Sequence, residues 1–167
     1  MKKRILFIED VYSDYEELFN GLSSEFHCFP DISSSEAEFV KFKLLYYKYI
    51  IRPSTENENA LLAYIDQLDI DVFIVDISLF VEDRGRRIDF TGGLLRKNLL
   101  SRHYPLKQAI VLTQYLDHEI SEFKQEGDIH VYKYEFNGVY PNDKIIDLLS
   151  KTVDRLANKL KPVSDGI

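Results

Sequence analysis

The chain has 167 residues, of which 45% are hydrophobic and 29% are charged, and its formal net charge is −7. This length supplies one hydrophobic core rather than two, and the negative charge argues against general affinity for the nucleic acid backbone. The single cysteine, Cys28, excludes an intramolecular disulfide and is typical of a reducing compartment. We therefore expect a cytoplasmic protein that neither spans a membrane nor binds nucleic acid directly.

The first apolar run, Ile5–Ile8, predicts a strand that ends on the carboxylates Glu9 and Asp10. Behind it, Ser13 and Glu16 have the spacing of a capping box and predict the start of a helix. The inner face of this helix is expected to hold four residues: Tyr15, Leu18, Phe19 and Leu22.

A second strand is predicted over Phe26–Phe29, but the following segment, Ile32–Asn57, is ambiguous. Aromatic residues from Phe39 to Tyr49 lie close to one helical face, whereas Val40–Leu44 alternates like a strand. Of the two, the helix is favoured. The aromatic side chains either cover a partner's surface or pack on their own domain.

A further helix is predicted from Thr55, which has capping-box spacing to Glu58, and it leads into the stretch Ile70–Ser78. Within that stretch, Val72–Val75 is too short and too apolar for a lone helix, which favours a strand buried on both faces. This strand ends on Asp76. Its carboxylate either marks a ligand site at the end of a central strand or only starts a turn.

The second half of the chain repeats the pattern of strand and helix. A polar loop is expected over 82–89, Thr91-Gly92-Gly93 opens a helix, and the strand Gln108–Thr113 ends on a hydroxyl. Asp117 is expected to cap a modest helix with its inner face at three residues: Leu116, Ile120 and Phe123. The last strand, Ile129–Tyr132, ends on Lys133. The final helix starts at Pro141-Asn142 and should bury five residues: Ile145, Leu149, Val153, Leu156 and Leu160.

Strands and helices thus alternate five times with one extra segment. Right-handed crossovers predict an α/β fold in which a parallel sheet lies between two layers of helices. The carboxyl ends of its strands should then bring together Glu9, Asp10, Asp76, Thr113 and Lys133. Crowded carboxylates resist full ionisation unless a cation joins them, and oxygen ligands suit Mg²⁺. A hydroxyl and an ammonium opposite them suit the oxygens of a phosphoryl group.

With these residues, the chain resembles the receiver domains of response regulators in two-component signalling. The family carries an acidic pair, a phosphoacceptor Asp, a Thr or Ser and a Lys after successive strands, here Glu9-Asp10, Asp76, Thr113 and Lys133. The resemblance implies one receiver-like domain over residues 1–167 with an insertion at about 32–57. It also implies a three-layer, doubly wound sheet of five parallel strands in the flavodoxin-like order 2-1-3-4-5.

By this resemblance, Mg²⁺ is the cofactor. Asp10 and Asp76 would bind it directly together with the backbone carbonyl of Ser78, and Glu9 would act through a metal-bound water. Asp76 would accept the phosphoryl group. The protein would then be a phosphoacceptor that assists its own phosphorylation and dephosphorylation, and not an enzyme.

The resemblance also implies a switch. Thr113 would move toward the phosphoryl group, Lys133 would pair with it, and His130 occupies the position of the family's switch aromatic. A buried histidine whose ring nitrogens have hydrogen-bond partners is an equally good interpretation of His130. The expected partners are a histidine kinase or phosphotransfer protein, a downstream protein, and a second copy of the chain.

Three features depart from the family pattern. Tyr134 replaces the proline that usually follows the Lys, and Gln114 replaces the small residue that usually follows the Thr. The loop after the phosphoacceptor is long and carries Arg84, Arg86 and Arg87. These arginines either reach a phosphate or an acidic partner, or form a solvated run of charge.

Two other functions compete with the phosphorylated switch. A pseudo-receiver would keep the fold and most of the acids but work as an unphosphorylated protein-interaction module, which Gln114 and Tyr134 favour. A Mg²⁺-dependent phosphohydrolase would also use acids at strand ends. Ser78 argues against this second function, because such enzymes often carry a general acid two residues after the nucleophilic Asp.

Overall fold

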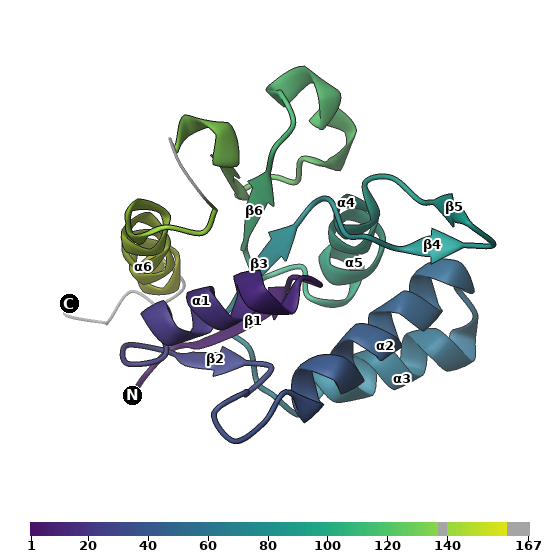
Figure 1. Ribbon diagram of the computed structural model, residues 1–167, viewed down its shortest axis with the longest axis horizontal. Helices are drawn as coiled ribbons and strands as arrows, with labels where there is room; N and C mark the ends of the chain where they lie inside the picture. Colours follow the sequence, from purple (N-terminus) through teal and green to yellow (C-terminus); the bar gives the residue numbers. More distant parts are fainter. Residues whose placement is uncertain (137–139, 160–167) are drawn as a thin grey trace, which may run out of the picture.

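The computed structural model describes residues 1–136 and 140–159. Its elements are β1 (Arg4–Ile8), α1 (Tyr12–Leu22), β2 (His27–Phe29), α2 (Ala37–Ile51), α3 (Thr55–Asp66), β3 (Val72–Asp76), β4 (Glu82–Asp83), β5 (Arg86–Arg87), α4 (Thr91–Leu95), η1 (Arg96–Leu100), α5 (Ser101–His103), β6 (Ala109–Thr113), η2 (Asp117–Glu119), η3 (Ser121–Phe123), β7 (Ile129–Tyr132), η4 (Lys133–Glu135) and α6 (Asp143–Lys159). Figure 1 shows their arrangement.

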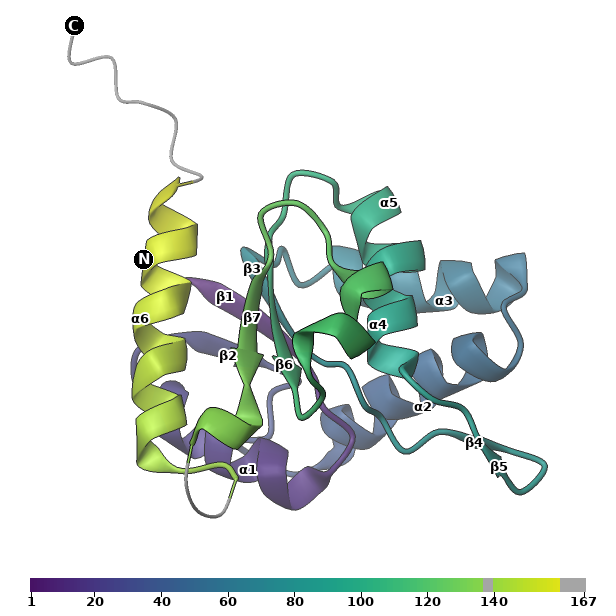
Figure 2. The same cartoon turned by 90° about the horizontal axis from the view of Figure 1, so that it is seen from above.

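Five strands form one parallel sheet in the order β2-β1-β3-β6-β7, which is the predicted order 2-1-3-4-5. Its strands are nearly continuous apolar runs because both faces are covered, and β3 is buried along its whole length. Successive side chains point to opposite faces. Ile5 and Phe7 pack with α1 and α6, whereas Leu6 and Ile8 pack with α2, α3 and the helix formed by α4, η1 and α5 (Figure 2).

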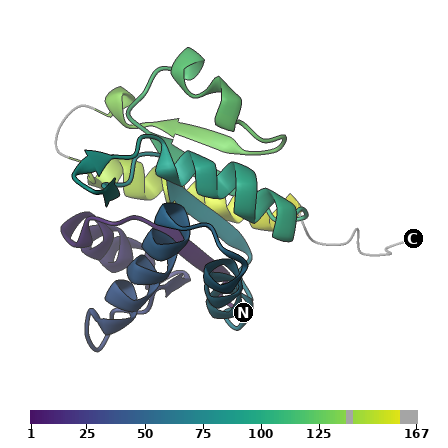
Figure 3. The same cartoon turned by 90° about the vertical axis from the view of Figure 1, so that its right-hand side faces the viewer.

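Helix α2 resolves the ambiguous segment in favour of a helix. Its aromatic residues Phe39, Phe42 and Tyr46 are buried, while Val40 and Leu44, which a strand pattern would pair with Phe42, are 44% and 54% exposed. Burial of aromatic side chains at helical spacing therefore outweighs the local alternation. Helices α2 and α3 lie side by side between β2 and β3 in the chain (Figures 1 and 3).

The predicted capping boxes at Ser13 and Thr55 are wrong. Helix α1 begins at Tyr12, and its N-cap residue, Val11, makes no side-chain hydrogen bond. Helix α3 is capped by Ser54, whose hydroxyl accepts a hydrogen bond from the N–H of Asn57 at 3.2 Å. The Ser54 side chain therefore takes the capping role one residue before the predicted position.

The helix predicted at Asp117 is also wrong, because the chain there forms only the single 3₁₀ turns η2 and η3. The Asp117 carboxylate accepts hydrogen bonds from Lys124 and Tyr132 instead of capping a helix. Ile120 and Phe123 are buried as predicted, but Leu116 is exposed. Two buried anchors are enough to hold a turn but do not require a full helix.

Helix α6 buries Ile145, Leu149, Val153 and Leu156 as predicted, while Leu160 lies outside the described residues. The predicted loop over 82–89 contains the short antiparallel hairpin β4-β5. No helix within residues 1–136 and 140–159 is long and apolar enough to cross a bilayer.

Candidate functional site at the carboxyl ends of the strands

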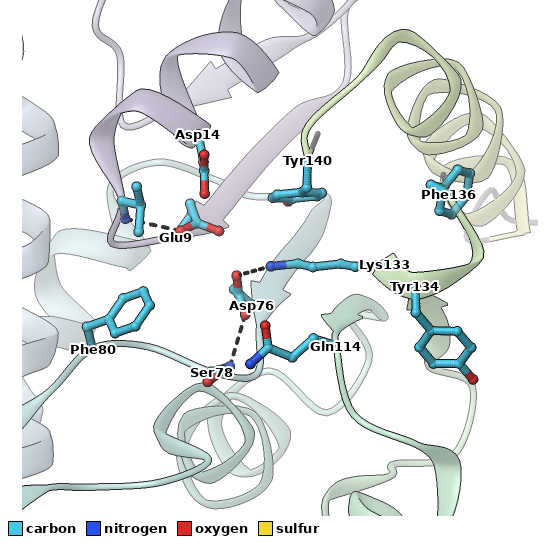
Figure 4. A pocket seen from close by; sticks show the side chains of 11 residues that line it. Glu9, Asp14, Asp76, Ser78, Phe80, Gln114, Lys133, Tyr134, Phe136 and Tyr140 are labelled. Atoms are coloured by element: carbon cyan, nitrogen blue, oxygen red, sulfur yellow. Dashed lines mark hydrogen bonds and ion pairs between the residues drawn. The ribbon is translucent and has the colours of Figure 1, made fainter. Parts of the chain in front are cut away.

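A cavity of about 430 Å³ opens at the carboxyl ends of β1, β3 and β7 (Figure 4). Parallel strands end there together, and their following loops diverge, which leaves a crevice. The lining residues are Glu9, Val11, Asp14, Asp76, Ser78, Phe80, Gln114, Lys133, Tyr134, Phe136 and Tyr140. Three of the five residues predicted to converge therefore face one cavity: Glu9, Asp76 and Lys133.

Asp76 is the last residue of β3 and is only 4% exposed. Its Oδ2 accepts a hydrogen bond from Lys133 Nζ at 2.6 Å, and its Oδ1 accepts one from the N–H of Ser78 at 2.9 Å. Lys133 follows β7 directly, and its ammonium also lies 4.1 Å from the centroid of the Tyr140 ring. The two strand ends thus hold a largely buried ion pair between a carboxylate and an ammonium (Figure 4).

Glu9 lies beside this pair and is also buried (Figure 4). Its Oε1 accepts a hydrogen bond from the N–H of Val11 at 3.1 Å, while its Oε2 has no partner among the described residues. Burial, and then the nearby Asp76 carboxylate, raise the pKa of Glu9 to about 10. One ammonium therefore does not compensate both carboxylates, and the site favours a proton or a further cation at Glu9.

Asp10 does not line the cavity, in contrast to the expected convergence. Its Oδ2 accepts hydrogen bonds from the Tyr47 hydroxyl at 2.5 Å and from the N–H of Phe80 at 2.6 Å. Its Oδ1 is buried without a partner among the described residues. Helix α2 and the loop after β3 therefore hold this carboxylate.

Thr113 also differs from the expectation. It is fully buried at the end of β6, and its Oγ1 accepts a hydrogen bond from the N–H of Tyr115 at 2.9 Å. The next residue, Gln114, lines the cavity instead. The hydroxyl of Ser78 accepts a hydrogen bond from Arg87 at 3.0 Å, so one arginine of the long loop reaches the edge of the site.

His130 lies in β7 opposite Val111 of β6. Its Nε2 is buried without a partner among the described residues, and burial, followed by the charge of Lys124, lowers its pKa. The imidazole is therefore favoured in its neutral form. Arg84 and Arg86 are exposed, as a solvated run of charge would be.

Several residues of the site region were not predicted, Tyr47 and Tyr140 among them. Tyr47 bonds Asp10 although 37 residues separate them, and Tyr140 places its ring against Lys133. An aromatic run in an ambiguous segment and a tyrosine before a proline carry no local pattern that points to this site. Only the packing of α2 and of the segment before α6 brings them there.

The side chains fit a divalent cation in their chemistry. Glu9 Oε2 and Asp10 Oδ1 are buried carboxylate oxygens that lack partners among the described residues, and hard cations such as Mg²⁺ prefer oxygen ligands. Within residues 1–136 and 140–159, however, no group of three His, Cys, Asp or Glu side chains is arranged as metal ligands. Asp10 does not line the cavity with Glu9 and Asp76, and Tyr47 bonds its Oδ2.

Receiver domains of response regulators have this fold. Chemotaxis protein CheY4 of Vibrio cholerae aligns with a TM-score of 0.56 at 16% identity, over 93% of this chain and 99% of that one. A response regulator receiver protein from Sinorhizobium medicae aligns at 0.55 and 15% identity, over 94% and 95% of the two chains. A CheY-like receiver domain protein from Methanospirillum hungatei aligns at 0.50 and 16%, over 95% and 99%.

No protein-family model matches the chain, and no curated protein matches its sequence. At identities of 15 to 16%, the structural likeness shows the fold alone. The chain therefore has the receiver fold, and its chemistry depends on its own residues.

Proposed function

We propose that the chain is a phosphorylatable receiver module in which Asp76 accepts a phosphoryl group in the presence of Mg²⁺. The observation that carries this proposal is the Asp76–Lys133 ion pair at 2.6 Å, which faces Glu9 inside a cavity at the strand ends. The receiver fold supports the same function. A histidine kinase or phosphotransfer protein is then the natural phosphoryl donor.

In the proposed step, a carboxylate oxygen of Asp76 forms a bond to phosphorus while the bond from phosphorus to the donor's leaving group breaks. The product is an acyl phosphate on Asp76. The Lys133 ammonium donates a hydrogen bond to this carboxylate and can pair with the added phosphoryl oxygens. Asp10, Asp76 and the backbone carbonyl of Ser78 would hold Mg²⁺, with Glu9 acting through a water, and the cation would neutralise charge on the phosphoryl oxygens when bound.

Beryllofluoride, which mimics a phosphoryl group on a carboxylate, tests this proposal. We expect beryllofluoride with Mg²⁺ to raise the unfolding temperature of the wild-type chain and to leave Asp76→Asn unchanged. Asp147→Asn is the matched control, because Asp147 is an exposed carboxylate on α6 and should respond as wild type does. An equal response of Asp76→Asn and wild type would contradict the proposal.

A pseudo-receiver that acts as a protein-interaction module is the second candidate. Three observations favour it: Asp10 is held outside the cavity, the Thr113 hydroxyl is bonded to its own loop, and Gln114 lines the cavity. Failure of beryllofluoride and acetyl phosphate at every concentration would support it. Steady turnover of a phosphomonoester would instead support a Mg²⁺-dependent phosphohydrolase, which Ser78 at the general-acid position disfavours.

We further infer that residues 1–167 act as one receiver module in the cytoplasm and that the segment over about 32–57, which contains α2, is an insertion. Phosphorylation would change binding to a downstream protein or to a second copy of the chain. The phosphoryl group adds charge and acceptor oxygens beside β6 and β7, where Thr113 and His130 lie. Their rearrangement would alter the adjoining surface, and we propose no direct contact with nucleic acid.

A further inference from the structure

Two residues of helix α2, one turn apart, donate hydrogen bonds to Asp10. The Tyr47 hydroxyl donates to Asp10 Oδ2 at 2.5 Å, and Lys43 Nζ donates to the backbone carbonyl of Asp10 at 3.0 Å. The Lys43 ammonium also lies 5.3 Å from the centroid of the Tyr47 ring. Phe42 and Tyr46 of the same helix are buried in the core, so these two contacts rest on a fixed support.

The loop after β3 completes this arrangement. The N–H of Phe80 donates to the same Oδ2 of Asp10 at 2.6 Å, and the Tyr47 hydroxyl lies 3.1 Å from the carbonyl oxygen of Phe80. Burial, and then the bonded Asp10 carboxylate, raise the pKa of Tyr47, so its hydroxyl keeps the proton that it donates. Charged acceptors make such hydrogen bonds roughly twice as strong as neutral ones.

With these contacts in place, Asp10 is not among the residues that line the cavity, whereas Glu9 and Asp76 are. Tyr47 and Phe80 both bond its Oδ2, so a cation that drew this oxygen into the cavity would have to displace them. We propose that Tyr47 withholds Asp10 from the cation, so that cation binding and the α2 contact compete for one carboxylate. This inference rests on the proposed function, and it makes the position of α2 a determinant of cation affinity.

The competing interpretation is that Tyr47 orients Asp10 as a cation ligand. Residues that orient metal ligands strengthen binding, and their loss weakens it about 10- to 100-fold. Competition predicts the opposite sign. The absence of Asp10 from the cavity lining favours competition, because an orienting residue would present the carboxylate beside Glu9 and Asp76.

The test is a calorimetric Mg²⁺ titration of wild type and Tyr47→Phe. We expect the dissociation constant to fall about tenfold in Tyr47→Phe, because a hydrogen bond to a charged group opposes binding in wild type only. Tyr64→Phe is the matched control. It removes a tyrosine hydroxyl that bonds the Glu38 carboxylate at 3.0 Å across the α2–α3 pair, away from the cavity, and should leave the affinity unchanged.

Thermal unfolding separates competition from a purely structural effect. Loss of structure alone would lower the unfolding temperature equally with and without Mg²⁺, whereas competition enlarges the rise that Mg²⁺ produces. Equal or weaker Mg²⁺ binding by Tyr47→Phe would overturn the inference and leave phosphorylation of Asp76 standing. Absence of Mg²⁺ binding by both proteins would overturn the inference and the cation site of the proposed function together.

Discussion

The Asp76–Lys133 pair joins the ends of two strands and is shielded from water, with side chains 6% and 16% exposed. Removing two charges from water is costly, and a buried pair is weak evidence of net stabilisation. Removing only one partner of such a pair is strongly destabilising, because the remaining charge stays buried. The pair therefore has a testable energetic signature that exposed ion pairs lack.

Lys133→Met should lower the free energy of unfolding by about 3 kcal/mol, because it leaves the Asp76 carboxylate buried without its ammonium. Urea unfolding measures this change. Lys151→Met is the control: the Lys151–Asp147 pair is 74% and 65% exposed, and its loss should cost less than about 0.5 kcal/mol. Equal effects of the two substitutions would show that the buried pair is not special.

Glu9 predicts a dependence of stability on pH. Its folded pKa of about 10 lies above the unfolded value of 4.5, so the folded chain keeps a proton that the unfolded chain releases. Stability should therefore fall as the pH rises through this window. Glu9→Gln cannot ionise, so without divalent cations its stability advantage over wild type should grow between about pH 6 and about pH 9. Parallel stability curves would contradict the raised pKa.

Sequence alone predicted that Glu9, Asp76 and Lys133 would share one edge of the sheet, because each follows a recognisable apolar run. It did not predict the directions of Asp10 and Thr113. Their side chains follow hydrogen bonds to Tyr47 and Tyr115. A rotamer that depends on a partner brought in by tertiary packing has no local pattern in the chain.

Helix α4 begins against the end of β3, and Gly92 makes this close approach possible. Its N–H donates to the Ile77 carbonyl at 3.1 Å, and a Cβ at this position would lie 1.7 Å from the carbonyl oxygen of Asp76. The glycine pair that predicts a helix start thus also sets the backbone that carries the proposed phosphoacceptor. Side-chain adjustment cannot relieve a clash with a backbone oxygen.

Gly92→Ala should cost about 3 kcal/mol of stability and should perturb the NMR signals of Asp76, since one backbone segment must shift. Gly21→Ala in α1 is the comparison. Its Cβ would meet only side-chain atoms of Ile146, at 2.8 Å, and the higher helix propensity of alanine offsets part of the strain. A Gly92→Ala chain as stable as Gly21→Ala would contradict this reading of the junction.

The helices that could be predicted are those with a long buried face, such as α1 and α6. The segment between β6 and β7 could not be, since Ile120 and Phe123 have the same spacing in a helix as in two successive 3₁₀ turns. There the Asp117 contacts with Lys124 and Tyr132 decide the conformation. Capping motifs were equally uncertain, because Ser54 and Thr55 are both good caps.

The strand order of the sheet follows from the alternation of strands and helices along the chain and from right-handed crossovers. It does not depend on any single side chain. Burial of both faces of β1 requires helices on each side of the sheet, and the five strands then place their carboxyl ends at one rim. Function is not fixed at this level, because many chemistries share one fold. It depends on whether Asp76, with its buried ammonium partner, is reactive.

Locating a phosphoryl group on the chain tests that dependence most directly. After incubation with acetyl phosphate and Mg²⁺, borohydride reduction converts an aspartyl phosphate to homoserine, which tandem mass spectrometry assigns to one position. We predict modification at position 76 in wild type and in Asp147→Asn, and none in Asp76→Asn. Modification at another aspartate, or an unmodified wild-type chain under conditions that saturate it with Mg²⁺, would contradict the account.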